Sequence, residues 1–215
     1  YNGNLLYHGC VPLKEDGNLK SVRIFGRAYK GKGLYEVLES YVRKGFYAMD
    51  PKEKERGKDI MWYIWLSENS PLFGKDKMAT FERYFLAEKE THKEKKNPYY
   101  LLLEDEKVVE KILKEFGLEN EDAHIINGHV PVKCKDGENP VKCGGKVLVI
   151  DGGFSKAYQK ETGIAGYTLI YNSYGLILAA HKPFESTEAA IEKESDIHSD
   201  STVVKRTLER KKVED

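Results

Sequence analysis

Apolar residues recur at helical spacing in the first half of the chain and in short continuous runs in the second half. Between residues 34 and 42 they are three and four positions apart, which places them on one face of a helix: Leu34, Val37, Leu38, Tyr41 and Val42. Gly45 is the predicted C-terminal stop of this helix. Residues 147–150 are all apolar, which is typical of a strand covered on both faces. The pattern predicts a mixed α/β fold, with most helices in the first half.

Three further helices are predicted before the strands of the second half. Asp50-Pro51 indicates a helix start, because proline suits the first helical position. The buried end of this helix is predicted at Ile60, Met61, Ile64 and Trp65. Residues 67–98 predict a loop and then a helix with an inner stripe of Met78, Phe81, Phe85 and Leu86. Asp105 is the predicted N-cap of the last helix, which ends before Gly117.

Strand-like segments precede and follow these helices. Residues 4–8, NLLYH, predict a short buried strand that ends at the His8-Gly9 pair. Residues 20–33 predict an extended segment, and residues 124–129, HIINGH, predict a strand that ends at a Gly-His pair. Two β-rich runs on either side of residues 172–175 predict a hairpin. From Phe184 onward the chain is polar, and we expect a loosely ordered extension there.

The composition excludes several classes of partner. The 215 residues include 35 basic and 35 acidic side chains, so the net charge of +0 gives no sign of a nucleic-acid surface. No apolar run approaches the length of a membrane span.

The charged run 93–96 is predicted to be a solvated helix end. Three sparse cysteines fit a reducing cytosol, and the start at Tyr1, without methionine, suggests a fragment of a longer protein.

Two histidines at strand ends are the strongest chemical signal in the chain. His8 precedes Gly9 and His129 follows Gly128, and neutral imidazole is the commonest protein ligand for transition metals. The two side chains can converge if their strands are neighbours in one sheet. The alternative is that His129 is only a solvated turn residue, and the residue pattern leaves both interpretations open.

Longer stretches carry a resemblance to a known family. LLYHGCVP at residues 5–12, NGHVPV at 127–132 and IDGGFS at 150–155 resemble segments of calcineurin-like metallophosphoesterases. SPLFGKDKMATFERYF at 70–85, together with the stretch from 137 to 176, resembles the class 3 fructose-1,6-bisphosphatases of bacteria. The resemblance implies an α/β fold that contains part of the calcineurin-like metallophosphoesterase sheet sandwich, with a helical insertion.

The resemblance also divides the chain into four segments. Residues 1–33 would end the first half of the sheet and carry a metal-ligand strand, and residues 34–118 would form the helical insertion or cap. Residues 119–184 would form the second half of the sheet, and residues 185–215 a polar C-terminal tail.

The implied activity is hydrolysis of the 1-phosphate of fructose 1,6-bisphosphate in gluconeogenesis, by hydroxide at a dinuclear Mn²⁺ site in the cytoplasm. His8 and His129 match two ligands of one metal ion. Lys75, Lys77 and Arg83 are the predicted contacts to the sugar bisphosphate, although Arg83 could equally be an exposed helical residue. The remaining metal motifs of the family lie N-terminal to the matching region, so we expect this piece alone to be inactive. A homo-oligomer is compatible with the sequence.

Two other interpretations stay open. The chain could belong to another metallophosphoesterase, one that acts on dinucleoside polyphosphates or phosphoproteins. It could also be a non-catalytic domain that binds a phosphorylated metabolite or another subunit.

Overall fold

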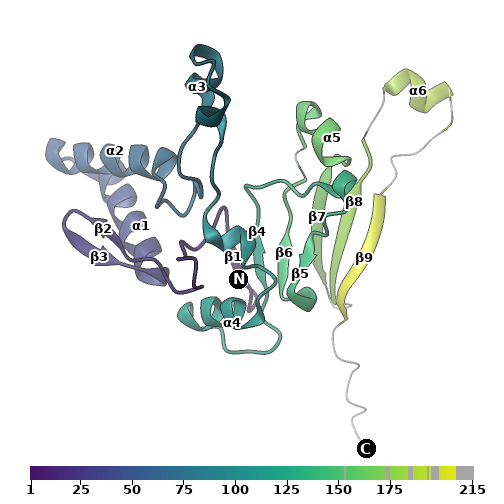
Figure 1. The fold of residues 1–215 in the computed structure, drawn as a ribbon. Coiled ribbons are helices and arrows are strands. Elements are labelled where there is room, and N and C mark those ends of the chain that lie inside the picture. Colours follow the sequence, from purple (N-terminus) through teal and green to yellow (C-terminus); the bar gives the residue numbers. More distant parts are fainter. Residues whose placement is uncertain (153, 173–174, 184–185, 193, 195–198, 207–215) are drawn as a thin grey trace, which may run out of the picture. The chain divides into compact units, whose positions relative to one another are not determined.

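The computed structural model describes residues 1–152, 154–172, 175–183, 186–192, 194 and 199–206. The chain divides into two compact units, Tyr1–Ile125 and Ile126–Asp215, and each is described by itself. Both units contain helices and strands (Figure 1), so the predicted mixed α/β class is confirmed. The calcineurin-like sandwich and the division into four segments stay predictions.

The first unit begins with β1 (Leu5–Tyr7) and a hairpin of β2 (Val22–Ile24) and β3 (Arg27–Tyr29). Ile24 pairs with Arg27, so the connection is only two residues long. Phe25 and Gly26 have φ angles of 45° and 83°, the backbone that a tight two-residue hairpin turn requires. The segment predicted as extended therefore folds back on itself.

Two long helices pack on this hairpin. They are α1 (Gly31–Tyr47) and α2 (Pro51–Leu66). Their shared core, which includes two residues of β2, consists of Val22, Ile24, Leu34, Leu38, Ile60 and Ile64. The Asp50 carboxylate accepts a hydrogen bond from Lys52 N at 2.7 Å, which confirms the predicted start of α2 at Pro51.

Gly45 does not end α1, contrary to the prediction. The helix continues to Tyr47. A Cβ built on Gly45 would collide with the Cα of Gly57 in α2. The glycine is there because α1 and α2 approach each other too closely for a side chain at this point, which is a tertiary requirement and not a cap.

Two predicted apolar stripes were also wrong in part. Met61 is 53% exposed and Trp65 is 66% exposed, because α2 buries the narrower stripe of Gly57, Ile60 and Ile64. The short helix α3 (Thr80–Phe85) buries none of its residues. Its predicted inner residues are exposed by 45 to 79%: Met78, Phe81, Phe85 and Leu86.

The rest of the first unit follows the prediction more closely. After the 3₁₀ turns η1 (Lys89–His92) and η2 (Pro98–Leu101) comes α4 (Glu106–Glu115). The Asp105 carboxylate accepts from the backbone N–H groups of Lys107 and Val108, as an N-cap should. The inner face of α4 is buried at Val108, Val109, Ile112 and Leu113. Gly117 has a φ of 77°, as expected of a residue just past a helix end.

Short strands and turns fill the first part of the second unit. β4 (Ile125–Asn127) begins at the unit boundary, and β5 (Val141–Lys142) pairs antiparallel with β6 (Val147–Val149). The 3₁₀ turns η3 (Cys134–Asp136) and η4 (Cys143–Gly145) connect them. All three residues of β6 are buried, as its continuous apolar run predicts.

A separate antiparallel sheet ends the chain. α5 (Lys156–Thr162) precedes β7 (Gly166–Asn172) and β8 (Gly175–His181), which pair as the predicted hairpin. After α6 (Thr187–Glu192), β9 (Ser199–Arg206) pairs with the other edge of β8. The expected loose extension was therefore wrong for residues 187–192, which form α6, and for residues 199–206. Backbone pairing along a free strand edge, as in β9, does not require an apolar sequence. Residues 207–215 lie outside the described part.

Among the helices of the described residues, none has both the length and the apolar character to span a membrane.

Candidate metal and phosphate site

His8 lies directly after β1 and its side chain is exposed. The next two residues, Gly9 and Cys10, pack closely against the segment Pro71–Leu72. A Cβ on Gly9 would collide with the carbonyl oxygen of Pro71, and the same oxygen accepts a hydrogen bond from Cys10 N at 2.8 Å. The segment Pro71–Leu72 therefore fixes the backbone that follows His8 and leaves no room for a side chain at Gly9.

One buried tyrosine, Tyr99, and two partly buried ones, Tyr7 and Tyr35, hold the strand that leads to His8. The hydroxyl groups of Tyr7 and Tyr99 are 2.7 Å apart, and the Tyr35 hydroxyl donates to Cys10 O at 2.9 Å. The Tyr7 ring centroid lies 6.1 Å from those of both Tyr35 and Tyr99. Burial raises the pKa of Tyr7 and of Tyr35, so both hydroxyl groups stay protonated and available for these bonds.

His124 has a structural role in the same unit. It is only 8% exposed, and Asn4 Oδ1 lies 3.1 Å from its backbone nitrogen and 3.0 Å from its Nδ1. Leu5 N also donates to His124 O at 2.9 Å, which ties the start of β1 to this residue. These contacts account for His124 without any ligand.

His129 occupies a strained turn in the second unit. Its φ is +67°, and Val130 N donates to Gly128 O at 2.8 Å across it. An i to i+2 bond with positive φ at the central residue defines a left-handed γ-turn, which is rare and strained for a residue with a side chain. Such strain persists where the surrounding structure imposes it, most often at functional sites.

The surrounding strands explain how this turn is imposed. Asn127 O accepts from Ile150 N at 2.8 Å, and Val132 N donates to Asp151 O at 2.8 Å. Two adjacent residues on one side therefore face residues five positions apart on the other. The four residues between Asn127 and Val132, residues 128–131, therefore bulge out of the hydrogen-bonded ladder, and His129 is one of them. The backbone of His129 is therefore fixed on both sides, and its role as a ligand stays a prediction.

Two of the three predicted phosphate contacts, Lys75 and Arg83, lie near the carboxylate of Glu94. Lys75 Nζ lies 2.9 Å from Glu94 Oε2, and Arg83 Nη2 lies 3.5 Å from Glu94 Oε1. Lys77 Nζ donates to Thr91 O at 2.6 Å. Burial raises the pKa of Glu94, but hydrogen bonds from Lys75 and the Ala79 backbone, with the nearby cations, lower it overall. Glu94 is thus a stable anion that partly neutralises this cluster.

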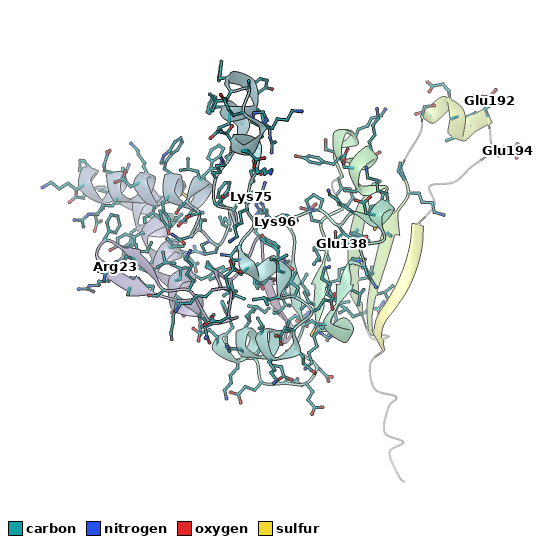
Figure 2. The ribbon with its side chains drawn as sticks, viewed as in Figure 1. Arg23, Lys75, Lys96, Glu138, Glu192 and Glu194 are labelled. Carbon is teal, nitrogen blue, oxygen red and sulfur yellow. The ribbon has the colours of Figure 1, made fainter. Side chains whose placement is uncertain are left out.

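Other lysines approach the same segment, and sequence reasoning missed them. A polar cavity of about 340 Å³ is lined in part by Lys14, Lys20, Lys75 and Lys96. Lys96 was expected in a solvated helix end, but it forms an isolated antiparallel bridge with Lys75. Figure 2 labels Lys75 and Lys96, which lie near each other below α3. No local pattern could reveal this cavity, because its lining residues come from three separate segments, residues 13–20, 68–76 and 95–98.

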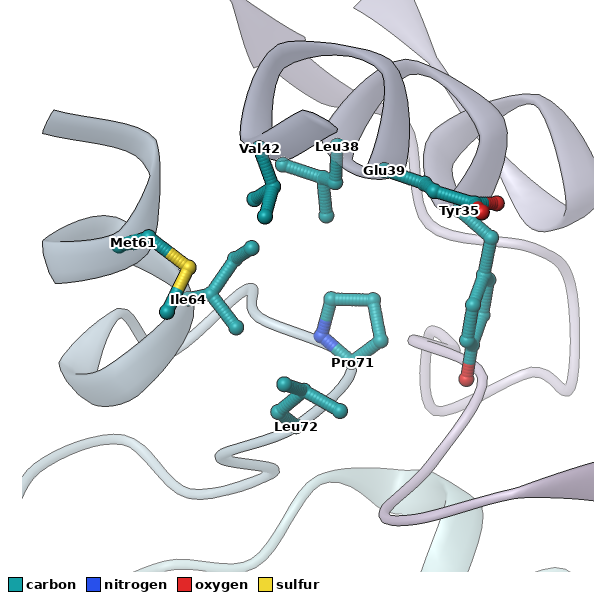
Figure 3. Close-up of a pocket in the computed structure, with 8 residues that line it drawn as sticks. All are labelled: Tyr35, Leu38, Glu39, Val42, Met61, Ile64, Pro71 and Leu72. Carbon is teal, nitrogen blue, oxygen red and sulfur yellow. The ribbon is translucent and has the colours of Figure 1, made fainter. Parts of the chain in front are cut away.

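A second, apolar pocket of about 250 Å³ lies between α1, α2 and the segment Pro71–Leu72 (Figure 3). Its only charged lining residue is Glu39, whose carboxylate is 2.6 Å from Arg43 Nε. A phosphate would find no cation in the lining of this pocket, so it is unsuited to the predicted substrate.

The two candidate metal ligands fit a transition-metal ion by donor type. They belong to different units, so their convergence on one ion stays a prediction. Within the described ranges, no group of three or more His, Cys, Asp or Glu side chains is arranged to hold a metal ion.

Comparisons with known proteins extend over the whole chain. The family model described as Firmicute fructose-1,6-bisphosphatase matches residues 1–215. The chain is 56% identical over 215 residues to "Fructose-1,6-bisphosphatase class 3 1" of Clostridium beijerinckii. It is 57% identical over 216 residues to a "Fructose-1,6-bisphosphatase class 3" of Clostridium botulinum (strain Hall), and 60% identical over 215 residues to that of Clostridioides difficile (strain 630). Each comparison covers 100% of this chain and 32% of the relative.

No solved structure matches the chain. The chain spans about a third of the length of the curated relatives, 32% in each case. Since one family model accounts for all 215 residues, this chain belongs to the Firmicute fructose-1,6-bisphosphatase family.

Proposed function

We propose that the chain is the C-terminal part of a metal-dependent phosphatase that removes the 1-phosphate of fructose 1,6-bisphosphate in gluconeogenesis. The observation that carries the proposal is the match to relatives named fructose-1,6-bisphosphatase class 3 along the whole chain. Because the chain spans 32% of each relative, the activity is proposed for a longer polypeptide that includes it.

In this proposal His8 and His129 are ligands of one Mn²⁺ ion of a dinuclear site. Two divalent ions would activate a water molecule and offset the negative charge of the phosphate. Neutral imidazole binds such an ion without adding negative charge, which suits a substrate that is itself anionic. The other ligands would come from polypeptide outside this chain.

The strained turn supports this role for His129. A side chain whose backbone is fixed by bonds on both sides loses little conformational freedom when it binds a ligand. The bonds of Asn127 O and Val132 N to residues 150 and 151 provide this fixation. His8 has an equivalent support from the packing of Gly9 against Pro71.

Lys75, Lys77 and Arg83 are proposed to contact the phosphate groups of the sugar. What supports this is their gathering in one segment, with Lys75 and Arg83 both near Glu94. A phosphate could replace Glu94 as the anionic partner of Arg83, whose side chain is 56% exposed.

The test is an assay of the full-length protein for phosphate release. We expect release from fructose 1,6-bisphosphate, no release from diadenosine tetraphosphate or a phosphoprotein, and loss of activity after chelation that added Mn²⁺ restores. Release from diadenosine tetraphosphate or the phosphoprotein alone would favour another phosphoesterase. No release from any of these substrates, with Mn²⁺ present, would favour a non-catalytic binding domain and contradict the proposal.

A further inference from the structure

The polar cavity of the first unit has an excess of positive charge. It holds about 340 Å³ and is lined by five lysines and three carboxylates, which leaves two positive charges in excess: Lys14, Lys20, Lys75, Lys95 and Lys96 against Glu15, Glu68 and Asp76. The other lining residues are Leu13, Asn97 and Pro98. A concave surface with a net positive charge attracts anions.

The carboxylates around the cavity bond mostly to groups other than Lys14, Lys20 and Lys96. Lys95 Nζ lies 2.9 Å from Glu15 Oε1, and Asp76 Oδ1 accepts from Lys95 N at 2.8 Å. Lys75 is paired with Glu94. In the described part of the chain, no ion pair joins the three remaining lysines of the lining to a carboxylate: Lys14, Lys20 and Lys96.

Backbone bonds hold these lysines in place. Lys75 and Lys96 are direct partners in an antiparallel bridge, and Asn97 N donates to Gly74 O at 2.9 Å. Asn97 Oδ1 accepts from Leu13 N at 3.2 Å, which ties this bridge to the segment that carries the other two lysines. On that segment Lys14 N donates to Asn18 O, and Lys20 N donates to Pro12 O, each at 2.9 Å.

The bridge itself places two like charges opposite each other. Side chains of directly paired residues in an antiparallel bridge lie on one face, about 5 Å apart at Cβ, and like charges there are destabilising. Glu94 forms ion pairs with Lys75 and Arg83, and the structure gives it no ion pair with Lys96. A bound anion would offset the charge of Lys96 and of the lysines across the cavity, so the arrangement is better suited to a ligand than to the empty fold.

We propose that this cavity is a binding site for a phosphate group, held by Lys14, Lys20 and Lys96. A phosphate has three or more acceptor oxygens, and each ammonium group supplies up to three donors, so one phosphate can bridge all three lysines. The volume also leaves room for a small organic group attached to the phosphate. The inference does not depend on the proposed function, since it requires no metal and neither strand-end histidine.

The first experiment measures inorganic phosphate binding by calorimetry to the metal-stripped full-length protein. The test variant is Lys14→Gln/Lys20→Gln/Lys96→Gln. The control is Lys52→Gln/Lys54→Gln/Lys58→Gln, which removes the same charge from exposed positions of α2. We expect the test variant to bind phosphate at least about tenfold more weakly than the wild type and the control to bind it unchanged. Equal binding by all three proteins, or no binding by the wild type at millimolar phosphate, would overturn the proposal.

A second measurement separates two sources of the phosphate group. If the cavity receives the phosphate of the sugar that is not hydrolysed, KM for fructose 1,6-bisphosphate rises in the test variant and not in the control. If it receives a separate phosphorylated ligand, KM is unchanged while phosphate affinity still falls. Both results support the site, and circular dichroism of the test variant checks that it is folded. Phosphate binding without any phosphatase activity would reject the proposed function and leave the cavity assignment intact.

Discussion

His129 has a backbone conformation that glycine adopts without strain and other residues do not, with φ at +67°. Replacing it with glycine removes both the imidazole and the strain, whereas alanine removes only the imidazole. We expect His129→Ala to have a free energy of unfolding about 1 kcal/mol lower than that of His129→Gly. Both variants should lose at least about 100-fold in phosphatase activity if the imidazole is a metal ligand. Urea unfolding and a phosphate-release assay of the same preparations measure the two effects.

His124 provides the contrasting case. His124→Ala removes the contact of Nδ1 with Asn4 Oδ1 in a buried setting, so it should lower the free energy of unfolding by about 1–3 kcal/mol. The folded His124→Ala protein should have the same specific activity as the wild type. A loss of activity in folded His124→Ala, or full activity in His129→Gly, would reverse the roles assigned to the two histidines.

The buried thiol and hydroxyl groups near His8 make stability depend on alkaline pH. Burial raises the pKa of the Cys10 thiol to about 12 from 9.0, and raises the pKa of Tyr7 above its ordinary 10.0. In the unfolded chain both groups lose their protons at the ordinary values, while in the folded chain they keep them. The contribution of these groups to the free energy of unfolding is therefore fully present below pH 9. It falls as pH rises from 9 to 12, by up to about 1.4 kcal/mol per pH unit for each group.

Urea unfolding from pH 7 to 11 measures this slope. Tyr7→Phe should make the decline above pH 10 shallower, because phenylalanine has no proton to lose. Tyr47→Phe is the control, since the Tyr47 ring is 74% exposed. A flat stability profile between pH 9 and 11 in the wild type would contradict the burial of these groups.

At the scale of elements, the contact between α1 and α2 depends on two glycines. Gly45→Ala would place a methyl group against the Cα of Gly57 and force the helices apart, at a cost of about 1–3 kcal/mol. Gly33→Ala is the matched control in the same helix, because no atom lies within 4 Å of its added Cβ. Alanine in an open helical position stabilises by about 0.5–1 kcal/mol, so the two substitutions should shift the thermal midpoint in opposite directions. An unchanged or higher thermal midpoint for Gly45→Ala would show that Gly45 is not a packing site.

The sequence predicts elements well where local chemistry determines them. Asp50 and Asp105 cap helices at the expected positions, since an N-cap bond joins residues only two or three apart. Gly45 was misread because its reason lies in another helix, Gly57 of α2. β9 was missed because its partner is the edge of β8, and backbone pairing leaves a weak mark in a polar sequence.

At the scale of the whole molecule, the same limit applies to the candidate site. Each strand-end histidine is visible in a short motif, but the strain at His129 arises from Asn127 and Val132 bonding to residues about 20 positions away. The lysine cavity draws on three separate segments, so only the folded first unit shows it. Sequence reasoning could therefore propose residues one at a time, whereas the turn at His129 and the lysine cavity required the fold.

The proposal that His8 and His129 share one metal ion has a thermodynamic consequence for the full-length protein. If both bind the same ion, losing either ligand removes most of the ion's contribution, and the second loss adds little. The reductions in log kcat/KM for His8→Ala, His129→Ala and the double variant should then be nearly equal. If each histidine acts independently, the reductions should add. Bound manganese, measured by metal analysis of each variant, should fall by about one ion per chain in all three. Additive losses with unchanged metal content would place the two histidines at separate sites and remove the basis of the shared centre.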